Sequence, residues 1–174
     1  MSILQIAQWN YDRNGLEYKE ELEQAMMAEE VNEFKDALIC YLHNPIDKLS
    51  AIVDMVDAYM DTSFVYYGTL IKQLGHAKLS DKNFDLSIMN TIMTEILITH
   101  KVKLYCADEG DTIGICLYYV MKANEKKPKT KAKGKVKKGS DWIDPKEQIR
   151  ELLIDRGYQE YPDYVNEVIE GEVV

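Results

Sequence analysis

Two groups of acidic side chains have the residue types and spacing of a divalent-cation site. The groups are Glu29, Glu30 and Glu33, and Asp54, Asp57 and Asp61. Carboxylates that are brought together repel each other strongly unless a cation neutralises them, so their convergence would imply a bound metal. Ligands that are all oxygen favour Mg²⁺, with Mn²⁺ as a substitute, over zinc. The two groups therefore predict a magnesium site.

Two amphipathic helices would bring these groups together. With the helical period of about 100° per residue, apolar stripes run along residues 16–42 and 47–74. The acidic side chains lie along one edge of each stripe. If the helices pack as an antiparallel pair across the break at His43-Asn44-Pro45, the acidic edges can face each other. A charged helix edge is also typical of a plain solvated surface, and this alternative stays open.

The same residues resemble a known family. Glu29-Glu30-x-x-Glu33, followed by a second acidic helix, resembles the MazG-like nucleoside triphosphate pyrophosphohydrolases of the all-α NTP pyrophosphatase superfamily. The segments 56–61 and 64–69 are similar to the Asp-x-x-x-Asp-x-x-Tyr-Val-x-x-Gly-Thr helix of a phage and bacterial branch often labelled phosphoribosyl-ATP pyrophosphohydrolase-like. Where the wider family usually carries Glu-x-x-Asp, this chain has Ala58 before Asp61, so Asp54 or Asp57 would have to supply the second ligand.

A second match lies near the end of the chain. Val120-x-x-Ala123-Asn124-x-x-Lys127, then Gly134-Lys135-Val136-x-Lys138-Gly139, Trp142 and Pro145, resemble that branch's Ser-Asn-x-x-Lys…Gly-Lys-x-x-Lys-Gly…Phe/Tyr…Pro tail. The two matches occur in the family's order. Residues 71–117 separate them by more than we expect of compact members, which indicates an insertion there.

The resemblance implies a Mg²⁺-dependent enzyme that hydrolyses an NTP or dNTP to the monophosphate and pyrophosphate, acting as a homo-oligomer, either dimer or tetramer. The implied metal ligands are Glu30, Glu33, Asp54, Asp57 and Asp61, with Glu29 or Glu30 as the catalytic base. The implied phosphate contacts are Asn124, Lys127 and Lys138, and the implied base contacts are Trp9 and Asn10. The choice among dUTP, dCTP, non-standard nucleotides and phosphoribosyl-ATP stays open.

Length and composition predict one all-α, MazG-like domain. At 174 residues with 46% hydrophobic content, the chain is long enough for one well-buried domain. We expect a metal-binding helical core at 1–75, a helical insertion at 76–117, a substrate-binding arm and short helix at 118–157, and an acidic tail at 158–174. The insertion would serve subunit packing or extend the core of one monomer. Residues 112–123 are ambiguous between helix and strand, and the tail motif favours helix.

Several classes of protein are disfavoured by composition. No apolar run approaches the roughly 18 residues of a membrane span, and the N-terminus has no basic segment followed by an apolar one. We therefore expect no membrane association and a cytoplasmic protein, including a phage protein acting in its host's cytoplasm. None of the three histidines stands three residues after a glutamate, which argues against a di-iron carboxylate bundle.

The charge is unevenly distributed. Residues 122–139 hold nine lysines and one glutamate, a local charge of +8 within a total of −9, which leaves −17 for the rest. This basic arm is open to three interpretations: a solvated loop, a sequence-independent nucleic-acid contact, or an arm that folds over a triphosphate. The acidic body and the lack of aromatic residues before Trp142 argue against nucleic acid. The alternative to an enzyme is a catalytically silent helical module that binds nucleic acid or a regulatory partner through this arm.

Overall fold

The computed structural model describes residues 3–12, 17–44, 46–73, 83–127, 131–132, 135–136 and 142–160. Within these ranges the protein is all-α, with six helices and two small antiparallel sheets whose strands have two residues each. The helices are α1 (Ile3–Asp12), α2 (Glu20–His43), α3 (Lys48–Gln73), α4 (Asn83–Thr99), α5 (Thr112–Glu125) and α6 (Lys146–Asp155). Strand β1 (Tyr105–Cys106) pairs with β2 (Gly110–Asp111), and β3 (Lys131–Ala132) pairs with β4 (Lys135–Val136).

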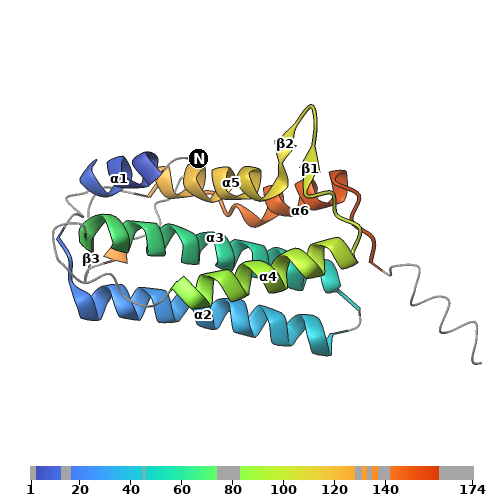
Figure 1. Cartoon of the computed structure of the whole chain (residues 1–174), viewed down its shortest axis with the longest axis horizontal. Helices are drawn as coiled ribbons and strands as arrows, with labels where there is room; N and C mark the ends of the chain where they lie inside the picture. The colour runs from blue at the N-terminus through green and yellow to red at the C-terminus, as the bar shows by residue number, and fades with distance from the viewer. Residues whose placement is uncertain are drawn as a thin grey trace, which may run out of the picture.

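The antiparallel pair of α2 and α3 forms the long axis of the molecule (Figure 1). Helices α1, α5 and α6 lie along the other side of α3, and α4 crosses the same helix on the face toward the viewer (Figure 1). Because α3 touches all the others, most of its length is buried, including Val56 and Met60, which have no exposed surface. The helix that carries three of the candidate ligands is therefore the central element of the fold.

The ends of the helices follow the local sequence. The side chain of Asp47 accepts a hydrogen bond from the Ser50 N–H at 2.9 Å and so caps the start of α3. Asp111 caps α5 in the same way through the Gly114 N–H at 2.8 Å, and residues 112–123 are helical as the tail motif indicates. Helix α2 begins at Glu20 rather than Leu16, because Lys19 has extended backbone angles.

A glycine ends α6. Gly157 has a φ of +93°, in the left-handed region that favours glycine. Its N–H donates to the Ile154 carbonyl at 2.9 Å, and the Tyr158 N–H donates to the Leu153 carbonyl at 3.0 Å. These bonds satisfy carbonyl groups that the helix end would otherwise leave without a partner. The chain then turns toward α3, where Glu160 accepts a hydrogen bond from the Lys48 N–H at 2.8 Å.

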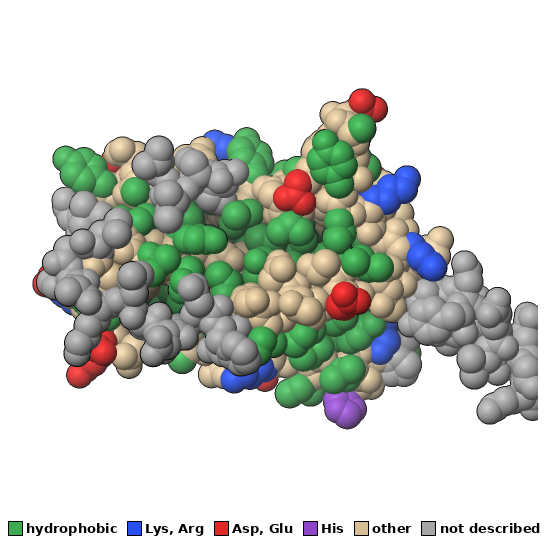
Figure 2. Space-filling model, viewed as in Figure 1, with side chains coloured by type: hydrophobic (Ala, Val, Ile, Leu, Met, Phe, Trp, Pro, Cys, Tyr) green, Lys and Arg blue, Asp and Glu red, His purple; other side chains and the backbone are tan. Residues whose placement is uncertain are grey.

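The segment predicted to be an insertion contributes to the same core as α2 and α3. Met89, Met93 and Leu97 of α4 are buried against α3, and Cys116 of α5 belongs to the same cluster. This packing corresponds to the extended monomer core, one of the two uses that the sequence leaves open for the segment. Hydrophobic side chains also remain visible at the surface over α3, α4 and α5 (Figure 2). Among the described residues, no helix is both long and apolar enough to cross a membrane.

We expect Leu97→Ala to lower the free energy of unfolding by about 2–5 kcal/mol, because it leaves a cavity where α4 meets the core. Ile98→Ala is the matched control, since the neighbouring side chain is 50% exposed and should lose less than about 1 kcal/mol. Urea unfolding followed by circular dichroism measures both values. Equal, small effects for the two variants would show that α4 is not an integral part of the core.

Candidate functional site

A cavity of about 920 Å³ runs between α2 and α3. Parts of α1, of α5 and of residues 142–146 complete its walls. The sequence-predicted site residues that line it are Trp9, Asn10, Glu29, Glu30, Glu33, Asp54, Asp57, Asp61, Asn124 and Lys127. Lys138 lies outside the described residues. The tertiary structure thus brings together side chains from three separate parts of the sequence.

Helical spacing explains how both acidic groups reach the cavity. Asp54, Asp57 and Asp61 are separated by three and four residues, so they lie on one face of α3. Glu30 and Glu33 are three residues apart on α2, which runs in the opposite direction (Figure 1). The apolar contact between the two helices, which includes Phe34, then turns both acidic edges to the same side.

Burial and mutual repulsion alter the acidity of two of these carboxyls. Burial raises the pKa of Glu30 from 4.5 to about 8, with further increases from the charges of Asp61 and Glu33 and a decrease from Lys127. Burial likewise raises the pKa of Asp57 from 3.8 to about 7, and the charge of Asp61 adds to this effect. The carboxylates of α2 and α3 therefore lie close enough to repel one another.

Lys146, at the start of α6, provides a positive charge at this end of the cavity. Its ammonium lies 2.8 Å from Asp54 Oδ1 and 3.9 Å from Asp57 Oδ2. The other oxygen of Asp57, Oδ1, is buried and accepts no hydrogen bond from any described residue. Sequence reasoning missed Lys146, although it directly follows Pro145, the last residue of the matched tail. Asp54, a predicted metal ligand, is thus paired with lysine here.

The chemistry of these candidate metal ligands fits Mg²⁺. All are carboxylate oxygens, and a cation would relieve their repulsion. Asp57 Oδ1 is a buried acceptor that receives no hydrogen bond from the described part of the chain. In the described ranges, no three Asp, Glu, His or Cys side chains converge closely enough to form a complete cage. Mg²⁺ commonly retains several waters and takes only one or two protein carboxylates together with substrate phosphates, so an open arrangement is compatible with it.

Trp9 connects the wall formed by α1 to the phosphate-contact candidate on α5. Its indole Nε1 donates to the Asn124 carbonyl at 3.0 Å, and its ring meets Phe64 edge to face with centroids 5.0 Å apart. Trp9 is also part of a small apolar cluster with Ile6 and Met121. Trp9 therefore packs in an apolar cluster and also lines the cavity where it was predicted to contact a base.

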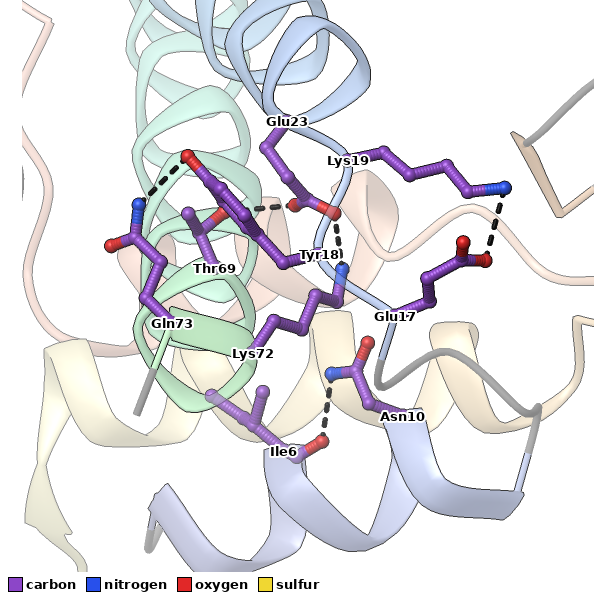
Figure 3. Close-up of polar contacts among 9 residues, drawn as sticks. All are labelled: Ile6, Asn10, Glu17, Tyr18, Lys19, Glu23, Thr69, Lys72 and Gln73. Atoms are coloured by element: carbon purple, nitrogen blue, oxygen red, sulfur yellow. Dashed lines mark hydrogen bonds and ion pairs between the residues drawn. The ribbon is translucent and has the colours of Figure 1, made fainter. Parts of the chain in front are cut away.

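The far end of the cavity contains a second ion pair that sequence reasoning missed. Lys72 of α3 lies 2.7 Å from Glu23 of α2, and both side chains are more than nine-tenths buried (Figure 3). Thr69 donates to the other oxygen of Glu23 at 2.9 Å. Nearby, Asn10 Nδ2 donates to the Ile6 carbonyl at 2.9 Å (Figure 3). No motif marks Glu23 or Lys72, because their pairing depends on the register of α2 against α3.

The raised pKa values predict a pH-dependent stability. Glu30 and Asp57 bind protons more tightly folded than unfolded, so their contribution is complete below about pH 4 and is lost as the pH rises to about 8. In EDTA we expect the melting temperature to fall between about pH 5 and pH 8, and Glu30→Gln to reduce this fall. Mg²⁺ should raise the melting temperature more at the higher pH, where both carboxyls are ionised.

Thermal unfolding at several pH values, with Mg²⁺ or EDTA, measures this behaviour. Glu21→Gln is the matched control, because Glu21 is an exposed glutamate on the same helix and does not line the cavity. It should keep the wild-type pH profile. A Glu30→Gln profile indistinguishable from that of Glu21→Gln would contradict the repulsion described above.

Comparisons with protein-family models, with curated proteins and with solved structures find no match to this chain. The likeness to the MazG-like family therefore remains a prediction from the motifs.

Proposed function

We propose that this chain is a MazG-like, Mg²⁺-dependent pyrophosphohydrolase that converts a nucleoside or deoxynucleoside triphosphate to the monophosphate and pyrophosphate. The observation that carries the proposal is the lining of one cavity by both acidic groups together with Asn124 and Lys127. A triphosphate needs charge neutralisation along its phosphates and a base that receives the proton of the attacking water. The cavity offers residues for both tasks.

Glu30, Glu33, Asp57 and Asp61 are the proposed metal ligands, with Asp54 as a further ligand if Lys146 releases it. Bound Mg²⁺ would neutralise phosphate oxygens and lower the pKa of a coordinated water. The protein's part is to hold the carboxylates in register across α2 and α3. Asp57 is buried and Glu30 and Asp61 are partly buried, so these three charges act more strongly on the phosphates than they would in bulk water, whereas Glu33 is exposed.

Glu29 or Glu30 would receive the proton from the attacking water. A general base works best when its pKa is near the working pH; burial raises the pKa of Glu30 to about 8, and a bound cation would lower it from there. Glu29 is one residue away, exposed at the rim of the same cavity. The water oxygen bonds to the α- or the β-phosphorus and the bridging bond between these two phosphates breaks. The leaving group takes the electron pair, and it is pyrophosphate after attack on the α-phosphorus and the nucleoside monophosphate after attack on the β-phosphorus.

Asn124 and Lys127 would contact the phosphates. They are three residues apart at the C-terminal end of α5, and the charge of Lys127 already acts on Glu30. Trp9 holds the backbone of Asn124 in place through its indole N–H. Lys146 is another lysine on the cavity wall, and it would move from Asp54 to a phosphate oxygen once the carboxylates bind metal.

We also propose a homo-oligomer. The hydrophobic side chains visible over α3, α4 and α5 support an apolar contact with a second copy of this chain (Figure 2). The acidic groups and Asn124 come from one copy, so the central chemistry does not need residues from another.

The reaction is tested with a panel of NTPs and dNTPs, including dUTP, by measuring pyrophosphate and orthophosphate separately in Mg²⁺. We expect pyrophosphate as the product, and we expect Glu33→Gln and Asp61→Asn each to reduce its release by about 100-fold or more, since each removes a ligand charge. Glu21→Gln should retain wild-type activity, because that side chain lies outside the cavity. EDTA should stop the reaction.

Other outcomes distinguish the remaining possibilities. Orthophosphate as the only product would contradict the proposed bond cleavage. If no nucleotide is hydrolysed and nucleotide binding survives EDTA, the enzyme proposal is wrong. The chain would then be a catalytically silent module that binds phosphates through lysine side chains alone. Equal activity of Asp61→Asn and wild type would refute the proposed metal site.

A further inference from the structure

The wall formed by α3 changes its chemistry along the cavity. Asp57 and Asp61 are followed on the same face by Phe64, then Gly68, then Lys72. Lys72 is eleven residues beyond Asp61, which is about 16 Å along a helix axis, and its side chain tilts back toward Gly68. If the phosphates of a nucleotide lie at the aspartates, its base extends toward Phe64, Gly68 and Lys72.

The buried Lys72–Glu23 pair lies where the edge of that base would be. The two side chains are 8% and 4% exposed, and both line the cavity. Burying an ion pair costs desolvation that the pairing only partly recovers, so such a pair is weak evidence for a purely structural role. Both residues also line the cavity, so a bound ligand would lie beside the pair.

The polarity of this end of the cavity is set by bonds within the protein. Lys72 can only donate, and among the described residues one of its three N–H groups has a partner, Glu23. Glu23 can only accept while ionised. Asn10 Nδ2 is committed to the Ile6 carbonyl, so the Asn10 Oδ1 acceptor is left on the side toward Lys72 (Figure 3). The three residues therefore present two acceptors and one donor.

Gly68 allows this arrangement. A Cβ atom at this position would lie 3.3 Å from Asn10 Nδ2, which is closer than an ordinary contact. Because Gly68 has no side chain, Asn10 of α1 can pack directly against α3 at this position. Gly68 is about one helical turn before Lys72. The recognition group thus combines residues from α1, α2 and α3.

We propose that Glu23, Lys72 and Asn10 select a nucleobase with an exocyclic amine beside a ring-nitrogen acceptor, as in cytosine and adenine, over a keto base such as uracil. The amine donates its two hydrogens to Glu23 and Asn10 Oδ1, and the ring nitrogen accepts from Lys72. Uracil would place a carbonyl oxygen against the Glu23 carboxylate and leave an acceptor unmatched. The inference rests on the proposed nucleotide-binding function and names its specificity-determining residues.

Binding of two non-hydrolysable probes tests the inference apart from catalysis. The α,β-imido analogues of dCTP and dUTP differ only at the base edge, and calorimetry in Mg²⁺ measures both affinities. We expect the wild type to bind the cytosine analogue at least about tenfold more tightly, because a buried polar site rejects a ligand that leaves its groups unpaired. Glu23→Gln and Lys72→Met should each reduce this ratio to within about threefold.

Thr69→Val is the matched control. It removes the hydrogen bond to Glu23 from a side chain that lines a different pocket, so the cytosine preference should persist. Circular dichroism verifies that each variant is folded. If a single variant does not fold, the Glu23→Gln/Lys72→Gln double variant is used in its place, because it keeps a neutral hydrogen-bonded pair.

The outcomes separate this inference from the proposed reaction. Equal affinity for the two analogues, or preference for uracil, overturns the inference even if pyrophosphate is released. A cytosine preference that is unchanged in the Glu23 and Lys72 variants also overturns it. Selective binding that these variants abolish supports the inference, even if the wild type releases no pyrophosphate from dCTP and the proposed reaction fails.

Discussion

The burial of like charges beside the apolar contact of α2 with α3 is the constraint on which the site depends. Phe34 and Val56 belong to the core, while Glu30 and Asp57 on the same two helices line the cavity. Hydrophobic burial holds the two helices together. It therefore keeps close together carboxylates that would repel one another and separate in the unfolded chain. The pKa values of Glu30 and Asp57 are raised because both carboxyls are removed from water and lie near other carboxylates.

Positive charge enters the cavity at separate places and with different partners. Lys146 neutralises Asp54 at the acidic end and remains partly exposed, whereas Lys72 is buried with Glu23 at the other end. An exposed pair is weak and can exchange partners, while a buried pair keeps its geometry. This contrast is consistent with a mobile phosphate contact at one end and a rigid base contact at the other.

Local signals predicted much of the fold. The cap at Asp47 and the glycine at 157 act within one helical turn, so the local sequence is enough to place them, whereas the cap at Asp111 was found only in the structure. The short β1–β2 and β3–β4 pairs were not predicted, because two-residue strands have no periodic pattern. The packing of α4 also required the structure, since an amphipathic helix can cover its own monomer or a neighbour with the same stripe.

The sequence by itself determined that the chain is helical, which residues on each helix share an edge, and which side chains are capable of binding a cation. The tertiary structure alone decided that Lys146 faces Asp54, that Lys72 meets Glu23, and that Trp9 reaches Asn124. The physical reason is range. Helical periodicity and capping act over a few neighbouring residues, whereas these contacts join positions far apart in the chain and depend on how the helices pack.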